Sequence, residues 1–342
     1  MVCCFIGAHA IKTTKSIGRF APSPTGALHL GNLRTFLATW IHARQNNVDI
    51  MMRMEDLNIV RLKPGSMEQI YSDFKWLGLD WDLGAGLTEN QLQDITQGSF
   101  SQYYQSNRNQ IYVSAFQKLL NEGLVYPCSC SRKDIQMTQS APHAENELKY
   151  ANTCRDRWKD EASAANHKGQ VSSWRFRASD GVTEFYDGFF GQQSSKVLEW
   201  SGDFVIAQTR KQYSYQLAVV VDDADQGVNW VIRGSDLLMS SHRQIQLQEA
   251  LGYPKVNYLH LPLLIGADGK RLAKRHGDWK ISTLRAKGFS PEKVLGLLAW
   301  TLGQCAYGEK INLSDLYKSF NWSAINKQNF SIDEKIRLDF GI

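Results

Sequence analysis

A string of residues near the start of the chain has the types that a phosphate-binding turn requires. Residues 18–32 read GRFAPSPTGALHLGN. Gly26 and Gly31 leave room where a phosphate approaches the backbone, and His29 stands where a predicted helix opens with its N-terminus attracting negative charge. His29 can donate a hydrogen bond to the α-phosphate of ATP, where catalysis depends on positioning and charge stabilisation. A bare His-x-Gly-Asn motif would favour an ordinary helix cap, but the complete string favours a phosphate site.

A second string, residues 269–277, reads GKRLAKRHG and concentrates positive charge. Gly266 and Gly269 give it the backbone freedom that a closing loop requires. A basic loop on a basic protein is usually a solvated surface, and alone this string would indicate no more than that. The two strings together indicate a phosphate site that is built from two segments of the chain.

Three of the six cysteines, Cys128, Cys130 and Cys154, have a spacing that suits a metal. The other three do not complete a disulfide framework with them, which favours a reduced, cytoplasmic protein. Zinc takes four ligands and favours thiolates, so the three cysteines predict a zinc site. A Cys-x-Cys pair is also compatible with two buried core residues, and the spacing alone leaves both interpretations open.

These residues must be positioned by an alternating framework of strands and helices. Residues 17–20 and 49–54 read as short buried strands, the second suited to a parallel sheet. Residues 30–45 and 64–77 read as helices, the second with Gly78 after its end. This order predicts an α/β fold with a doubly wound parallel sheet of the Rossmann type.

The middle of the chain is less regular than its flanks. It combines a helix, the cysteine region, a polar stretch and short strands, which predicts an α+β insertion that splits the sheet. Regular α/β character then returns, and residues 291–302 read as a helix. The predicted domains are an N-terminal extension (1–17), two sheet halves (18–106 and 214–280), the insertion (107–213) and a small helical module (281–342).

Composition excludes several classes of protein. A chain of 342 residues with 43% hydrophobic and 21% charged residues is typical of a globular protein of two or three domains. No apolar run approaches the roughly 18 residues that a membrane span needs, and residues 1–17 make a poor signal peptide. The formal net charge of +5 suits a polyanionic partner but identifies none.

The first string closely resembles the opening of the glutamyl-tRNA synthetases, which are class I aminoacyl-tRNA synthetases, and of their shortened relatives. The resemblance continues through RMEDLN at 53–58, LGLDWD at 77–82, VVVDD at 219–223 and VIRG at 231–234. The second string is similar to the family's flexible Lys-Leu-Ser-Lys-Arg loop (KMSKS-like). Because the matches span nearly all of residues 18–280, the resemblance implies the class I catalytic fold.

The resemblance also implies the residues of the site. The pocket for L-glutamate would be formed by Arg19, Phe20, Ala21, Pro22, Ser23, Glu55, Tyr215 and Arg233. Arginine forks suit the two carboxylates of glutamate, and Glu55 would meet its ammonium group. The ATP site would be formed by Thr25, His29, Gly31, Asn32, Asp236 and Lys274. His29 and Lys274 would be catalytic, with Lys274 stabilising charge on departing pyrophosphate, and Mg²⁺ would accompany ATP.

Some positions depart from the family or stay open. Ala273 replaces the loop serine, which removes a hydroxyl that could bind ATP. Val219 stands where many full-length members carry Asn. The shortened relatives also carry Val at this position. For zinc, the resemblance adds Tyr150 to the three cysteines, with His143 as the alternative fourth ligand. His260 has no metal spacing and is interpreted as structural.

The shortened relatives supply the implied function. Full-length members continue with a helical domain that reads the glutamate anticodon, whereas the residues after Lys274 suffice only for a small module, so no anticodon-binding domain is expected. This pattern resembles the glutamyl-queuosine tRNA(Asp) synthetases, which activate L-glutamate with ATP without tRNA and transfer it to queuosine in tRNA(Asp). A monomeric enzyme without membrane contact is expected. The alternatives are a compact glutamyl-tRNA synthetase that charges tRNA(Glu) and a non-catalytic RNA-binding paralogue.

Overall fold

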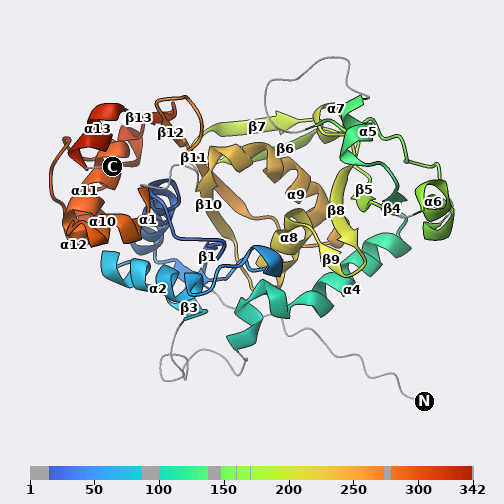
Figure 1. The fold of residues 1–342 in the computed structure, drawn as a ribbon, viewed down its shortest axis with the longest axis horizontal. Helices are drawn as coiled ribbons and strands as arrows, with labels where there is room; N and C mark the ends of the chain where they lie inside the picture. The colour runs from blue at the N-terminus through green and yellow to red at the C-terminus, as the bar shows by residue number, and fades with distance from the viewer. Residues whose placement is uncertain are drawn as a thin grey trace.

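The computed structural model of the protein describes residues 15–86, 100–137, 148–158, 160–169, 171–272 and 279–340. Lys274, Ala273 and His143 lie outside these ranges. Figure 1 shows a parallel sheet at the centre of the molecule. The helical module lies at one end, and the antiparallel sheet that carries the cysteines lies at the other.

Three parallel strands form the first half of the central sheet. They are β1 (Ile17–Phe20), β2 (Asp49–Met52) and β3 (Leu83–Gly84), in that spatial order. Helices α1 (Leu30–Asn46) and α2 (Ser66–Leu77) connect them. The predicted strand–helix–strand–helix order is confirmed. Helix α2 begins later than predicted, because Gly65 adopts a left-handed conformation (φ 73°) that ends the preceding turn.

The second half of the sheet lies directly beside the first. Its strands β10 (Trp230–Gly234) and β11 (Asn257–Leu261) are parallel, with helices α8 (Tyr215–Asp225) before them and α9 (Leu238–Leu251) between them. Strand β10 neighbours β1: the amide of Asn229 donates to the carbonyl of Ile17 at 3.0 Å, and the amide of Ile17 donates to Asn229 Oδ1 at 2.9 Å. The two halves therefore meet at the first strand of each, and the predicted parallel sheet is confirmed.

A hairpin from the predicted insertion joins this central sheet. Strands β6 (Thr183–Asp187) and β7 (Gly191–Ser195) are antiparallel to each other, and β6 pairs in parallel with β11, with Asp187 opposite Tyr258. The hairpin is thus continuous in structure with the catalytic half although it lies within residues 107–213. Sequence pattern does not reveal such a pairing, because the two strands are far apart along the chain.

The rest of the insertion is an antiparallel sheet flanked by helices. Its strands are β4 (Val125–Cys128), β5 (Ser173–Phe176), β8 (Phe204–Thr209) and β9 (Gln212–Tyr213). Its helices are α4 (Asn109–Asn121), α5 (Arg132–Met137), α6 (Glu161–Lys168) and α7 (Val197–Trp200). Residues of α4, this sheet and α8 share one apolar core, in which Val219 is buried. Helix α8 therefore joins the insertion to the central sheet.

The last segment is mainly helical, as predicted, and packs on the first half of the sheet. It comprises α10 (Ile281–Ala286), α11 (Pro291–Thr301), α12 (Leu313–Ser319), α13 (Glu334–Asp339) and β13 (Phe330–Ile332), which pairs with β12 (Leu264–Gly266). Helix α11 begins with a Ser290 cap and Pro291 at its first turn. Buried Arg34 of α1 donates to Thr301 Oγ1 at 3.2 Å, which ties the module to the sheet domain.

Short 3₁₀ helices complete the described structure. They are η1 (Ile59–Arg61), η2 (Phe100–Tyr103), η3 (Gln105–Asn107), η4 (Ser235–Leu237) and η6 (Trp322–Ala324). Within the described ranges, no helix combines the length and the apolar character that crossing a membrane demands.

Gly296 provides a test of the packing of α11. A Cβ atom there would lie 1.8 Å from the carbonyl oxygen of Glu309. We expect Gly296→Ala to lower the free energy of unfolding by about 2 kcal/mol despite the higher helix propensity of alanine, because the backbone of a neighbouring loop must move. Denaturant unfolding measures the change. Gln117→Ala, at an exposed position of α4, is the control and should leave stability nearly unchanged; equal effects would contradict the close packing.

Candidate active site

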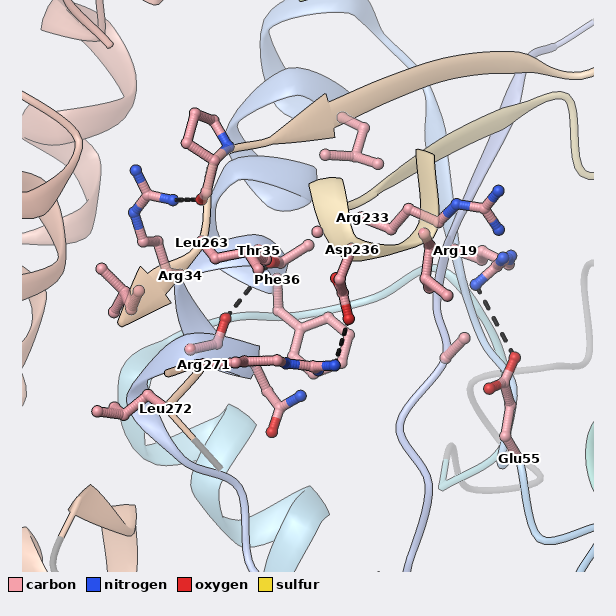
Figure 2. A pocket seen from close by; sticks show the side chains of 18 of the residues that line it. Arg19, Arg34, Thr35, Phe36, Glu55, Arg233, Asp236, Leu263, Arg271 and Leu272 are labelled. Carbon is pink, nitrogen blue, oxygen red and sulfur yellow. Dashed lines mark hydrogen bonds and ion pairs between the residues drawn. The ribbon is translucent and has the colours of Figure 1, made fainter. Parts of the chain in front are cut away.

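A cavity of about 140 Å³ opens at the carboxyl ends of β1 and β10, where the two halves of the sheet meet. Arg19 comes from β1 and Arg233 from β10, and both line it together with Glu55. Figure 2 shows these side chains around one space, with Asp236 and Arg271 on its other side. Ligands of open α/β sheets bind in such a crevice, where the strand order reverses.

A second hollow of about 310 Å³ adjoins the first and is formed by the first signature string. The two share Ala21, Asn32, Phe36 and Arg271. His29 stands at the N-cap of α1 with extended backbone (φ −118°), so the loop passes directly into the helix N-terminus. Adjacent hollows, one with charged walls and one at a helix N-terminus, can hold an amino acid beside a nucleotide phosphate.

The structure brings nearly all predicted site residues to these two hollows. Those that line one or both are Arg19, Ala21, Pro22, Ser23, Thr25, His29, Gly31, Asn32, Glu55, Tyr215, Arg233 and Asp236. Phe20 differs: its ring is fully buried and packs against Phe36 and Phe74, with centroids 5.6 and 4.7 Å away. Lys274 lies outside the described residues. The binding roles assigned to these residues stay predictions.

Arg271 of the second signature reaches the wall of the cavity. Its guanidinium forms an ion pair with Asp236, a predicted ATP-binding residue (Figure 2). Leu272 is buried beside it, and its amide donates to the carbonyl of Leu264 at 2.9 Å. The segment that leads into the second signature therefore borders the same cavity as the first.

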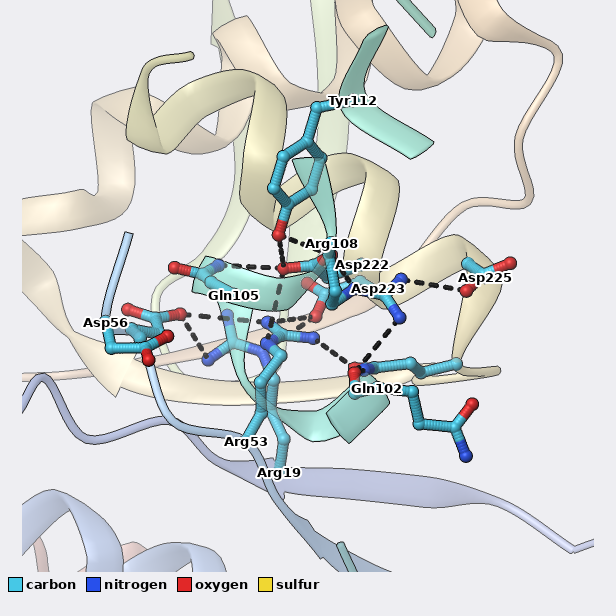
Figure 3. Close-up of polar contacts among 12 residues, drawn as sticks. Arg19, Arg53, Asp56, Gln102, Gln105, Arg108, Tyr112, Asp222, Asp223 and Asp225 are labelled. Atoms are coloured by element: carbon cyan, nitrogen blue, oxygen red, sulfur yellow. Dashed lines mark hydrogen bonds and ion pairs between the residues drawn. The ribbon is translucent and has the colours of Figure 1, made fainter. Parts of the chain in front are cut away.

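Arg19 belongs to a buried network of charges (Figure 3), and Glu55 adjoins it. Arg19 Nε lies 2.9 Å from Asp223 Oδ1, and Arg19 Nη1 lies 4.0 Å from Glu55 Oε1. Arg53 is fully buried and lies 2.7 Å from Asp223 and 3.7 Å from Glu55. Burial raises the pKa of Glu55, and the attraction of Arg19 and Arg53 opposes this rise.

The network continues into the insertion through helix α4. Asp222 accepts hydrogen bonds from Arg108 Nε at 2.6 Å, from Gln105 Nε2 at 2.8 Å and from the hydroxyl of Tyr112 at 2.9 Å. Arg108 also contacts Asp225 at 2.8 Å. The sequence singled out the string VVVDD without giving its aspartates a role. Asp222 and Asp223 form ion pairs with arginines from other segments of the chain. The string alone does not show which arginines lie next to them.

Arg233 has a separate set of partners. Its Nε donates to His260 Nε2 at 3.0 Å, its Nη2 donates to Ser241 Oγ at 2.7 Å, and its Nη1 donates to the hydroxyl of Tyr215 at 3.4 Å. The Nδ1 of His260 lies 2.7 Å from Asp187 Oδ2. The sequence interpretation missed these contacts, because His260 has no neighbouring motif residue that indicates a site.

Cys128, Cys130 and Cys154 come together at the end of β4, with their sulfur atoms within 4.8 Å of one another. The sulfurs of Cys130 and Cys154 are 3.5 Å apart, and the hydroxyl of Tyr150 lies 3.3 Å from Cys128 Sγ. Tetrahedral zinc with bonds of about 2.3 Å would separate its sulfur ligands by about 3.8 Å. The donor set of three thiols and one phenol therefore fits a zinc ion.

The charge state of this cluster also suits a cation. A hydrogen bond from the Cys128 thiol lowers the pKa of Cys154 to about 3, which leaves a thiolate there, while the pKa of Cys128 itself is raised. The guanidinium carbon of Arg175 lies 3.6 Å from the ring centroid of Tyr150, where a positive charge favours the phenolate. Burial raises the pKa of Tyr150, so a bound metal would have to supply the remaining attraction.

Asp222 and Asp225 allow a test of the network with two variants that change the same functional group. Asp222 is fully buried, and we expect Asp222→Asn to lower the free energy of unfolding by about 3 kcal/mol, because it leaves Arg108 and Arg53 undercompensated. The side chain of Asp225 is 38% exposed, so Asp225→Asn should cost less than about 1 kcal/mol. Urea unfolding measures both, and equal losses would contradict a buried network centred on Asp222.

Comparison with known families identifies the fold. The family model of the catalytic domain of class I tRNA synthetases (E and Q) matches residues 16–337. The structure of a glutamate–tRNA synthetase from Elizabethkingia anophelis superposes with a TM-score of 0.75 at 25% sequence identity, covering 95% of this chain and 70% of that chain. The glutamyl-type class I catalytic fold expected from the sequence is confirmed.

Similar curated proteins fall into two groups. A glutamyl-Q tRNA(Asp) synthetase from Symbiobacterium thermophilum is 42% identical over 313 residues, with 91% of this chain and 94% of the relative covered. One from Rhodopirellula baltica is 38% identical over 94% of this chain and 98% of its own length. A glutamate–tRNA ligase from Geobacter sulfurreducens is 36% identical, with 90% of this chain but 62% of the relative covered. The chain therefore belongs to the class I tRNA synthetases (E and Q), a family of ATP-dependent ligases, together with the proteins named glutamyl-Q tRNA(Asp) synthetases.

Proposed function

We propose that the protein activates L-glutamate with ATP to glutamyl-adenylate without needing tRNA and then transfers the glutamate to queuosine in the anticodon of tRNA(Asp). One observation carries this proposal. The charged cavity adjoins the hollow formed by residues 18–32, at the place where strands β1 and β10 meet. The proteins named glutamyl-Q tRNA(Asp) synthetases support it further, since they match this chain along nearly their whole length.

The charges around the cavity suit a zwitterion with a second carboxylate. The network contains three arginines, three carboxylates with little exposure (Glu55, Asp222 and Asp223) and the partly exposed Asp225. The ammonium group of glutamate would face the carboxylate of Glu55. Arg233 and Arg19 would bind the side-chain carboxylate of glutamate, helped by Tyr215. The α-carboxylate would then be left to react.

In the proposed reaction, the α-carboxylate attacks the α-phosphorus of ATP in line and expels pyrophosphate. Thr25, Gly31 and Asn32 would position ATP, with Asp236 at the far wall. His29 would donate a hydrogen bond to the α-phosphate, and Lys274 would stabilise charge on the departing pyrophosphate. Mg²⁺ bound to ATP would neutralise phosphate charge. A queuosine hydroxyl then attacks the adenylate carbonyl, forming the ester and releasing AMP.

The cysteine cluster would hold a structural zinc ion through Cys128, Cys130, Cys154 and Tyr150. The cluster fixes the turn after β4 to the segment around Tyr150, whose amide donates to the carbonyl of Ser201 at 2.9 Å. Exposed basic side chains lie next to the cluster in the sequence: Arg132, Lys133, Lys149 and Arg157. They would face the phosphates of the anticodon stem-loop. The domain boundaries, the monomeric state and the cytoplasmic location remain predictions.

Charging of tRNA(Glu) is the second candidate. Some curated glutamate–tRNA ligases are 32–36% identical to this chain, and a pocket for glutamate and ATP would serve either reaction. The two functions differ only in the RNA and the hydroxyl that receive the glutamate, so the acceptor RNA distinguishes them.

Transfer of radiolabelled glutamate tests the proposed acceptor. We expect label on queuosine-containing tRNA(Asp), and neither on the same tRNA without queuosine nor on tRNA(Glu), because the attacking hydroxyl belongs to the modified base. Glutamate-dependent ATP–pyrophosphate exchange without RNA provides the control for activation. Label on tRNA(Glu) alone would overturn the proposal in favour of the ligase, and absence of both exchange and label on any of the three RNAs would indicate a non-catalytic paralogue.

Removal of the metal tests the structural zinc. We expect the purified protein to contain one equivalent of zinc, and chelation to lower its melting temperature, because the cluster pins the end of β4. Cys154→Ser should lose most of the zinc, whereas Cys305→Ser, a cysteine outside the cluster, should retain it. Metal content by mass spectrometry with thermal unfolding gives the answer; full zinc occupancy in Cys154→Ser would refute this ligand set.

A further inference from the structure

The guanidinium of Arg233 is held by the buried His260 and Ser241 and by the partly buried Tyr215. His260 accepts from Nε, Ser241 from Nη2 and Tyr215 from Nη1. An arginine has five N–H donors, one on Nε and two on each terminal nitrogen. One donor on Nη1 and one on Nη2 are therefore left for a ligand, and together they match the two oxygens of a carboxylate.

His260 can accept from Arg233 only in one tautomer. Asp187 accepts from Nδ1 of His260, which requires the proton on Nδ1 and leaves the lone pair of Nε2 for Arg233. Both His260 and Asp187 are fully buried. Burial lowers the pKa of His260 to about 4, and this keeps the imidazole neutral near pH 7. A doubly protonated imidazole ring has no nitrogen lone pair that could accept a hydrogen bond from Arg233.

Asp187 is itself fixed by the backbone. Its Oδ1 accepts from the amides of Phe189 at 3.0 Å and Phe190 at 2.9 Å, and its Oδ2 accepts from the amide of His260 at 3.1 Å. Asp187, His260 and Arg233 stand on the adjacent strands β6, β11 and β10, where Arg233 and His260 are register partners. The row of hydrogen bonds thus crosses three adjacent strands to the cavity, with an offset of two residues between β6 and β11.

We propose that Asp187 and His260 are positioning residues that fix the orientation of Arg233, so that its two terminal nitrogens each present one N–H to the side-chain carboxylate of the substrate. This inference rests on the proposed function, in which Arg233 binds glutamate. It gives the β6–β7 hairpin a direct role in the amino-acid pocket. It also favours a carboxylate over an amide, because the NH₂ group of glutamine would face one of the two donors.

Two substitutions at His260 separate positioning from simple packing. The amide nitrogen of His260→Asn can still donate to Asp187, but the side chain offers no acceptor at the position of Nε2. The amide oxygen of His260→Gln reaches that position and can accept from Arg233. We expect His260→Asn to raise the KM for glutamate about tenfold or more, the size of one lost hydrogen bond to a charged group, and His260→Gln to recover part of it.

His242 provides the matched control. It is also buried, and its Nδ1 contacts the carbonyl of Thr183 at 3.1 Å, so His242→Asn disturbs the same hairpin without touching Arg233. We expect His242→Asn to lower the melting temperature but to leave the KM for glutamate unchanged. Steady-state ATP–pyrophosphate exchange on the full chain measures the KM for glutamate, the KM for ATP and the kcat, with glutamine as competing substrate. For His260→Asn, the KM for ATP should stay within twofold and the discrimination against glutamine should fall.

The outcomes distinguish this inference from the function on which it rests. Absence of glutamate-dependent exchange in the unmodified protein would contradict the proposed function. Normal exchange in that protein with an unchanged KM for glutamate in a folded His260→Asn variant would overturn the positioning role alone. Equal rises in KM for His260→Asn, His260→Gln and His242→Asn would assign the effect to packing and would also overturn it.

Discussion

The buried pairing of arginines with the aspartates of helix α8 is the interaction on which the rest of the structure depends. Asp222 and Asp223 are adjacent in the chain, yet Asp222 binds Arg108 of the insertion and Asp223 binds Arg19 and Arg53 of the first half of the sheet. A buried carboxylate without its cation would cost several kcal/mol, so each partner fixes the position of the other. Helix α8 therefore holds the insertion and the first half of the sheet in fixed positions relative to each other.

These ion pairs also position the cavity between the ends of β1 and β10. Arg19 and Glu55 line the cavity and also belong to the ion-pair network that holds the two halves together. Their positions are therefore fixed before a ligand binds. The same principle applies to Arg233, which is held by His260 across adjacent strands. A site whose charged groups are held in this way needs little reorganisation when it binds an ionic substrate.

The insertion is therefore less separate than its place in the sequence indicates. Arg108, the N-cap residue of its helix α4, joins the network, its hairpin β6–β7 extends the central sheet, and its apolar core continues into α8. The buried Val219 belongs to that shared core and not to the lining of the cavity. A nucleic acid bound to the insertion would thus contact elements that share a core and a sheet with the catalytic half.

The sequence by itself determined the alternation of strands and helices, the signature loop at His29 and the three clustered cysteines, because each depends on local pattern or close spacing. The family resemblance also named twelve residues that line the two hollows. Only the tertiary structure decided that Phe20 is core, that Asp222 and Asp223 balance arginines from three segments, and that His260 holds Arg233. These contacts join residues far apart in the chain, and their energy arises from burial, which no local pattern encodes.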